Sequence, residues 1–241
     1  MPITTPPMAL AFDVFGTIVD WRTSIAREAK AVLATIERAD IDAFHFADEW
    51  RTRYIPAMMN VTKGKRGFVK LDVLHREMLD EVLAKFDISY DQLGEAGRVD
   101  LTYAWHRLDP WPDSVAGLTR LKARFPIVTL SNGNIALMVN MARRAGLPWD
   151  AILGAEIAQN YKPDPKTYQA TAAALDLAPD QLCLVAAHHG DLSAGRAAGL
   201  QSAFVSRPME YGGRTAPDAH MGQDWEYSAS DLLDLADQLG C

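Results

Sequence analysis

The chain has 241 residues and a formal net charge of −7 at pH 7, and this length is enough to bury one large domain, or a core with a smaller inserted domain. The acidic balance argues against nucleic acid as a partner, because non-specific affinity for a phosphate backbone comes from clustered Lys and Arg. With two cysteines and no run near the ~18–20 apolar residues of a membrane span, we predict a soluble, cytoplasmic protein without a disulfide framework, zinc cluster or membrane partner.

The first predicted element is a short buried strand over residues 8–12, which ends at Asp13. Open α/β sheets bind their ligands at the carboxyl ends of the strands. A carboxylate at this place is therefore expected to carry chemistry.

A block with helical periodicity follows, over about residues 21–108. Apolar residues at three- and four-residue spacing predict a helix over 71–86, with helices through 25–36 and 46–58 as its packing partners. Turn formers at 62–67 and 108–112 mark connections.

Strands and helices alternate from Asp113 onward. We predict strands over 125–130, 151–154 and 182–187, helices from about 135 and from 165, one further strand and helix, and a final helix over 230–239. This alternation requires crossover helices and gives a parallel sheet covered on both faces. We therefore predict an α/β fold with a Rossmann-like core of residues 1–20 and 109–241. Residues 21–108 would be an inserted helical cap over the strand ends.

Four separated motifs then occur in a set order. They are Phe12-Asp-Val-Phe-Gly-Thr17, Leu130-Ser-Asn-Gly133, Tyr161-Lys-Pro-Asp-Pro165 with Tyr168, and His188-His-Gly-Asp191 followed by Ala194-Gly195. Each is weak alone, but together the chain resembles the haloacid dehalogenase superfamily, and in detail its 2-haloacid dehalogenase branch, over essentially its full length. The resemblance implies hydrolysis of short 2-haloalkanoic acids to 2-hydroxy acids through an aspartyl ester, with no cofactor or metal. It also implies a small anionic substrate, a halide product and a homodimer.

The phosphatase branch of the same superfamily is the main alternative. Its members hold magnesium with the nucleophilic Asp and acidic residues of the last motif, where this chain has Ala187 in place of one carboxylate. Phe15 stands where the phosphatases carry the acid that protonates the leaving group. Magnesium usually needs one or two carboxylates beside the substrate phosphate, so both losses argue against phosphoryl transfer. Hydrolysis at another activated carbon is a second alternative, because a fold does not dictate the leaving group. A third is a non-catalytic binding protein that retains the fold.

In this resemblance Asp13 is the nucleophile that forms the ester. Two carboxylates ~4 Å apart repel by about 4 kcal/mol at an effective dielectric near 20, so a nearby cation is needed. Lys162 is the candidate for holding Asp13 ionised and oriented. Thr17 is expected to orient Asp13, and Asp191 to pair with Lys162 without a metal. Tyr168 either orders the site through its hydroxyl or packs beneath the sheet.

Substrate contacts are expected from both parts of the chain. Ser131 and Asn132 end a strand before a helix, and the family uses these positions for the substrate carboxylate and the halide. Arg51 matches the cap arginine that receives the halide, with Arg53 as the alternative. Phe15 and Trp21 would form an apolar wall that keeps water from the nucleophile.

The last loop departs from the dehalogenase pattern, because Ala186 and His188 replace the Ser and Asn that help place the hydrolytic water. We predict that His188 takes the proton from water attacking the Asp13 ester, with His189 as the alternative and Glu28 as the residue that orients it. The segment 207–213 is expected to be a structured loop without chemistry. The motifs do not select a halogen, including fluoride, or a chain length or chirality.

Overall fold

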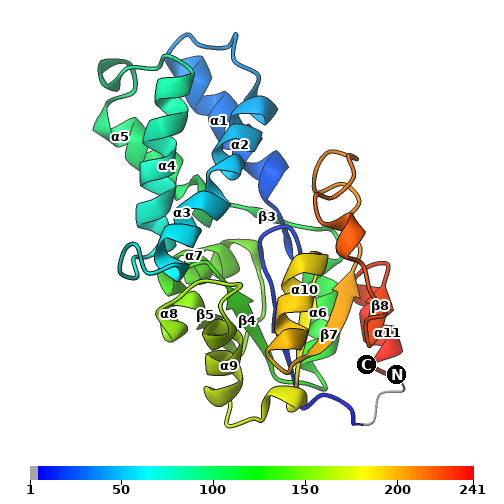
Figure 1. The fold of residues 1–241 in the computed structure, drawn as a ribbon. Helices are drawn as coiled ribbons and strands as arrows, with labels where there is room; N and C mark the ends of the chain where they lie inside the picture. The colour runs from blue at the N-terminus through cyan, green and yellow to red at the C-terminus, as the bar shows by residue number, and fades with distance from the viewer. Residues whose placement is uncertain (1–4) are drawn as a thin grey trace.

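Six parallel strands form one sheet at the centre of the protein, whose computed structural model describes residues 5–241 (Figure 1). In spatial order the strands are β5 (Ala151–Gly154), β4 (Ile127–Ser131), β1 (Ala9–Phe12), β6 (Leu182–Ala186), β7 (Gln201–Val205) and β8 (Tyr227–Ala229). Each neighbouring pair runs parallel, and β1 lies between β4 and β6. This confirms the predicted parallel α/β fold.

Helices cover both faces of the sheet, as parallel crossover connections require (Figure 1). Alternate residues of β1 face two apolar layers, with Leu10 and Phe12 in one layer and Ala9 and Ala11 in the other. The first layer includes side chains of α6 (Ser114–Lys122), α7 (Ile135–Ala145) and α11 (Leu232–Gln238), and the second includes those of α9 (Pro165–Ala173) and α10 (His189–Ala197). The short helix α8 (Ala155–Ala158) follows β5 directly.

A second group of helices lies above the carboxyl ends of the strands (Figure 1). It comprises α1 (Trp21–Thr35), α2 (Ala43–Thr52), α3 (Tyr54–Thr62), α4 (Leu71–Lys85), α5 (Tyr90–Thr102) and the 3₁₀ turn η1 (Tyr103–His106). The chain enters and leaves this group through an antiparallel ribbon of β2 (Val19–Asp20) and β3 (Asp109–Pro110). Within residues 5–241, no helix is both long and apolar enough to cross a membrane.

The helix predicted through residues 46–58 is wrong as one element, because the chain forms α2 and α3 with Arg53 between them. Pro56 explains the break. It has no N–H to donate to the carbonyl of Thr52, and its ring would clash with that carbonyl in a continuous helix. Helix α5 begins at a capping box in which Ser89 and Gln92 bond each other's backbone N–H groups.

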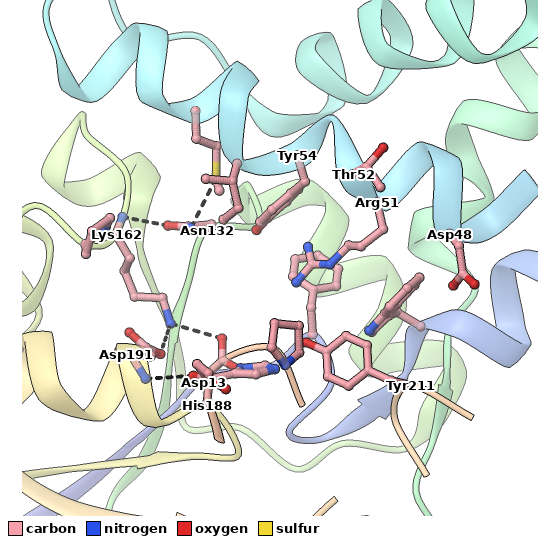
Figure 2. Close-up of a pocket in the computed structure, with 18 of the residues that line it drawn as sticks. Asp13, Asp48, Arg51, Thr52, Tyr54, Asn132, Lys162, His188, Asp191 and Tyr211 are labelled. Carbon is pink, nitrogen blue, oxygen red and sulfur yellow. Dashed lines mark hydrogen bonds and ion pairs between the residues drawn. The ribbon is translucent and has the colours of Figure 1, made fainter. Parts of the chain in front are cut away.

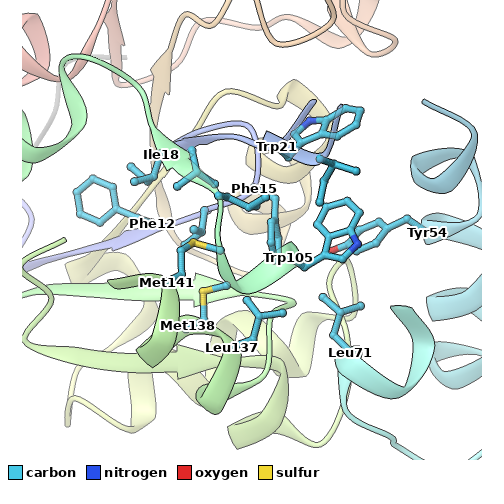
Figure 3. Close-up of a cluster of buried hydrophobic side chains, with 14 of the residues drawn as sticks. Phe12, Phe15, Ile18, Trp21, Tyr54, Leu71, Trp105, Leu137, Met138 and Met141 are labelled. Carbon is cyan, nitrogen blue, oxygen red and sulfur yellow. The ribbon is translucent and has the colours of Figure 1, made fainter. Parts of the chain in front are cut away.

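Aromatic side chains form the contact between the second group of helices and the sheet. Phe15, Trp21, Tyr54 and Trp105 lie together in Figure 3, and Phe15 meets the rings of Tyr54 and Trp105 edge-on. His75 of α4 joins them, with its ring centroid 4.3 Å from that of Trp105 and its side chain fully buried. Among the described residues neither ring nitrogen of His75 has a hydrogen-bond partner. Burial lowers the pKa of His75 to about 3.

This neutral histidine should make the fold sensitive to acid. The unfolded chain binds a proton at His75 below about pH 6.5, whereas the folded chain does so only near pH 3. Stability from this residue is therefore fully present above the unfolded pKa and falls as the pH drops, by about 2 kcal/mol between pH 7 and 5. We expect His75→Phe to remove this part of the pH dependence in urea unfolding, while the exposed His220→Phe leaves it unchanged. If the free energy of unfolding changes equally with pH in His75→Phe and in the parent protein, His75 is not the source of this acid sensitivity.

Candidate active site

Asp13 lies directly after β1, where the central strand meets its two parallel neighbours. Its backbone N–H donates to the carbonyl of Val185 on β6, and its side chain is buried, with 7% exposure. The Thr17 hydroxyl donates to Asp13 Oδ2 at 2.7 Å and accepts the N–H of Ala187 at 2.9 Å. The Thr17 hydroxyl therefore joins the Asp13 carboxylate to the loop after β6.

Lys162 lies between two carboxylates. Its Nζ donates to Asp13 Oδ1 at 3.0 Å and to Asp191 Oδ2 at 2.5 Å, and the Tyr168 hydroxyl donates to Asp191 Oδ1 at 2.7 Å. The Lys162 backbone N–H donates to Asn132 Oδ1, which ties this loop to the end of β4. Asp191 lies in the first turn of α10 rather than at its N-cap, which is His188. The structure thus brings together Asp13, Lys162 and Asp191 of three separate motifs, and Tyr168 contacts the site through its hydroxyl.

Charges set the protonation of this group. Burial by itself would raise the pKa of Asp13, but Lys162, together with hydrogen bonds from His188 and Thr17, holds it well below its usual range. Burial would likewise lower the pKa of Lys162, but Asp13 and Asp191 raise it above its ordinary value. The site therefore holds an ionised, desolvated carboxylate beside a cation that stays charged.

His188 completes the surroundings of Asp13. Its Nδ1 lies 3.1 Å from Asp13 Oδ2, and its Nε2 lies 3.0 Å from both carboxylate oxygens of Glu210. Glu210 is almost fully buried, with 2% exposure, and it accepts a hydrogen bond from Trp21 Nε1 at 3.0 Å. Burial would lower the pKa of His188, but the charge of Glu210 and the bond to Asp13 raise it well above its ordinary value.

Two predictions about this histidine are resolved here. The prediction that Glu28 orients His188 is wrong, because the Glu28 carboxylate is held by Arg107 at 2.7 Å and by Arg27 at 2.9 Å. His189 faces away from Asp13, since its ring stacks on Phe204 and its Nδ1 accepts a hydrogen bond from Trp225. Of the two histidines, His188 is the one that contacts Asp13.

The segment 207–213, expected to be a structured loop without chemistry, supplies Glu210, whose carboxylate contacts His188. Arg207 fixes the segment by two bonds to Asp113, at 2.7 and 2.8 Å, and by a bond to the carbonyl of Thr17. Gly16 has a φ of +89°, and a Cβ there would lie 2.2 Å from Glu210 Oε1. Gly16 thus leaves the space that the Glu210 carboxylate occupies. A glycine at this position in the sequence indicates a close approach, but it does not indicate which residue approaches.

A cavity of about 760 Å³ adjoins these residues, and its lining comes both from the loops after the strands and from the second helical group. Figure 2 shows Asp13, His188 and Lys162 on one side of it and Arg51 and Tyr54 on the other. Phe15 and Trp21 also line the cavity, as predicted for its apolar wall.

Arg51, not Arg53, faces the cavity. Its guanidinium lies over the ring of Tyr54 at 4.0 Å, and within the described chain its buried Nη1 has no hydrogen-bond partner. Arg53 is instead paired with Glu49 at 3.3 Å and Glu81 at 3.2 Å. A buried, unpartnered guanidinium N–H is a donor available for an anion.

The two polar residues at the end of β4 differ in position. Asn132 lines the cavity, and its Nδ2 lies 3.2 Å from the sulfur of Met58. Ser131 does not line the cavity, because its hydroxyl turns back to accept the N–H of Gly133 at 3.1 Å. The expected side-chain contact from Ser131 to the substrate is therefore not supported by this geometry.

The donor set around Asp13 does not fit a magnesium ion. The side-chain oxygens of Asp13 accept bonds from Lys162, Thr17 and His188, and the neighbouring Asp191 faces Lys162 and Tyr168. Across residues 5–241, no three His, Cys, Asp or Glu side chains are arranged to hold a metal. Magnesium needs oxygen ligands, and here the carboxylates face hydrogen-bond donors.

Comparison with known proteins decides the family. The family model for haloacid dehalogenase-like hydrolases matches residues 7–199, which is more than half of the chain. The chain belongs to this family of hydrolases. Among solved structures, the haloacid dehalogenase-like hydrolase resembles a defluorinating L-2-haloacid dehalogenase, with 47% identity, a TM-score of 0.94, and coverage of 98% of this chain and 96% of the other.

Curated relatives of the haloacid dehalogenase-like hydrolase include members with two kinds of activity in their names. (S)-2-haloacid dehalogenase 1 of Pseudomonas sp. (strain CBS-3) is 29% identical over 225 residues, which cover 89% of this chain and 92% of that protein. The phosphoglycolate phosphatase of Neisseria gonorrhoeae is 27% identical over 206 residues, with coverage of 82% and 79%. Family membership alone therefore does not choose the leaving group, and the site must do so.

Proposed function

We propose that this hydrolase converts 2-haloacids into 2-hydroxy acids through an ester on Asp13. One observation carries the proposal: a buried, ionised Asp13 faces a cavity whose opposite side presents the free Nη1 of Arg51. A carboxylate nucleophile and a halide acceptor across one cavity are the two groups that an in-line displacement needs. The likeness to named 2-haloacid dehalogenases supports the same reaction.

In the first step an oxygen of Asp13 attacks C2 of the substrate, and the carbon–halogen bond breaks as the halide leaves with its electron pair. Lys162 and Thr17 orient the carboxylate, and Asp191 and Tyr168 hold Lys162. Arg51 and Asn132 receive the halide and the substrate carboxylate. Back-side attack inverts C2, so an (S)-2-haloacid gives an (R)-2-hydroxy acid when the substituent order at C2 is unchanged. Phe15 and Trp21 keep water from the nucleophile.

In the second step water attacks the Asp13 carbonyl carbon, with His188 as the base. The imidazole stands beside the carboxylate that becomes the ester, at 3.1 Å. This restores Asp13 and releases the 2-hydroxy acid.

The arrangement of the chain fits a further part of this proposal. Residues 21–108 would act as a cap, since Arg51 and Tyr54 reach the cavity from α2 and α3 while Asp13 and Lys162 reach it from the sheet side.

The cysteines Cys183 and Cys241 are free thiols, in keeping with the proposed cytoplasmic location. The homodimer stays a prediction.

A panel of small acids tests the function. We expect halide release from chloroacetate, bromoacetate and (S)-2-chloropropionate, with (R)-lactate as the product of the last, and no loss of rate in EDTA. Fluoroacetate belongs in the panel because one similar structure is of a defluorinating enzyme. Magnesium-dependent release of phosphate from phosphoglycolate, with no halide from any acid, would instead support the phosphatase alternative.

A further inference from the structure

The ring of His188 bridges two carboxylates, Asp13 at Nδ1 and Glu210 at Nε2. An ionised carboxylate accepts hydrogen bonds and cannot donate them, so each ring nitrogen must carry a hydrogen to make both bonds. Both acids are held ionised, because Lys162 and His188 lower the pKa of Asp13 and His188 lowers that of Glu210, in each case against the effect of burial. His188 is therefore an imidazolium in the resting enzyme and cannot accept a proton from water in that state.

We propose that esterification of Asp13 converts His188 from the cationic partner of the nucleophile into the base that activates water, with Glu210 as the positioning residue that selects Nδ1 for this task. This inference rests on the proposed function and adds an order of proton transfers to it. It also assigns a role to a residue far from the four sequence motifs.

The charges around the ring change in one direction when the ester forms. Asp13 becomes neutral, so Nδ1–H loses its ionised acceptor, while Glu210 keeps its bond to Nε2–H. The other charges that line this part of the cavity include the cations Lys162, from the loop before α9, and Arg51, from α2. Asp191 is bound to Lys162, and Asp218 accepts the N–H of Gly190. Loss of one of the two carboxylates that contact the ring favours release of the Nδ1 proton to solvent.

The proton count closes with this order. During alkylation the C–O bond forms, the carbon–halogen bond breaks, the halide departs, and His188 releases one proton. During hydrolysis the water oxygen bonds to the Asp13 carbonyl carbon and one water hydrogen moves to Nδ1. The tetrahedral intermediate then expels the product oxygen, which takes the other water hydrogen. Asp13 is again ionised, His188 is again cationic, and the net yield is one halide, one proton and one hydroxy acid.

Several contacts place Glu210 for this role. Trp21 Nε1 donates to its Oε1, its backbone N–H donates to the Arg207 carbonyl, and the absence of a Cβ at Gly16 leaves room for its carboxylate. Nδ1 and Nε2 lie on opposite sides of the imidazole, so a fixed Glu210 bound to Nε2–H directs the lone pair of Nδ1 toward the ester. The arrangement resembles other sites in which a buried acid sets the tautomer of a catalytic imidazole.

Nitrogen-15 NMR of the histidine rings tests the inference directly, with a His188→Asn spectrum to identify the signal. We expect both nitrogens of His188 to be protonated at pH 7.5 in the parent protein. In Asp13→Asn, whose amide resembles the uncharged ester, the pKa of His188 should fall by about 1–3, with Nε2–H as the neutral tautomer. A neutral His188 in the parent, or an unchanged pKa in Asp13→Asn, would overturn the proposal.

Glu210→Gln tests the positioning residue. In this variant we expect the rate of ester hydrolysis to fall by about 10²-fold, whereas the rate of ester formation changes by much less. Both rates are measured by mass spectrometry of the quenched enzyme. The pH dependence of hydrolysis should also move, which a merely structural role would not cause, and Glu226→Gln is the matched control. Equal slowing of both steps would reject the role. If the parent forms no ester from any 2-haloacid, the proposed function fails, whereas the NMR result stands apart.

Discussion

Asp13→Asn should lower halide release from 2-chloropropionate by at least about 10⁴-fold, because an amide oxygen cannot displace a halide as a carboxylate does. The variant should still fold. Lys162 keeps Asp191 as its partner, and His188 keeps Glu210, so no buried cation is left without a carboxylate. The measurement is halide release over many enzyme equivalents, with mass spectrometry to detect any Asn that has reverted to Asp.

A matched control and an isotope experiment complete this test. Asp180→Asn removes an exposed carboxylate and should leave the rate unchanged. In the parent protein, turnover in ¹⁸O-labelled water should place the label in the Asp13 carboxylate, because water attacks the ester at its carbonyl carbon. Halide release that survives in Asp13→Asn without reversion, or label found in the product alone over many turnovers, would mean that water attacks the substrate directly.

Much of the fold follows from local patterns in the sequence. Strands β1, β4 and β6 are apolar runs buried on both faces, and such runs are visible without a partner in view. The joined helix over 46–58 was the clearest error, because the apolar spacing continues across Arg53 while the missing N–H of Pro56 does not alter that spacing. A periodic pattern reports the buried face, and it does not report whether the backbone is continuous.

The site divides in the same way. Asp13, Lys162 and Asp191 lie in segments at the carboxyl ends of the parallel strands. Because these ends meet at one edge of the sheet, the order of the strands already predicts that the three side chains lie close together. Glu210 could not be found by that argument, because it reaches His188 through a loop that depends on the pairing of Arg207 with Asp113, 94 positions away in the chain. Proximity in sequence to Asp13 favours Glu28 as the partner of His188, but the Glu28 carboxylate accepts a hydrogen bond from Arg107.

The second large effect is expected for Lys162→Met, which keeps an unbranched side chain and removes the charge. Lys162 has 7% exposure and is bonded to the buried Asp13 and to Asp191, whose side chain is 11% exposed. Breaking such an arrangement by removing one partner typically costs about 3–5 kcal/mol, because the remaining charges are left uncompensated. We expect a loss of this order in the free energy of unfolding at pH 7, and a fall in halide release of about 10²–10³-fold.

The pH dependence of Lys162→Met separates loss of charge from loss of packing. Lys162 is the largest influence that lowers the pKa of Asp13, so without it that pKa rises, and the ionised nucleophile is lost at a higher pH than in the parent. The stability that a depressed carboxylate pKa provides is present above its unfolded value and is lost as the pH falls through the folded value, so the variant should also recover part of its deficit in acid. We therefore expect the acid limb of kcat/KM to move to higher pH in Lys162→Met and to stay in place in the exposed control Lys166→Met. An unmoved acid limb would mean that His188 and Thr17 suffice to keep Asp13 ionised, and that Lys162 serves the substrate carboxylate instead.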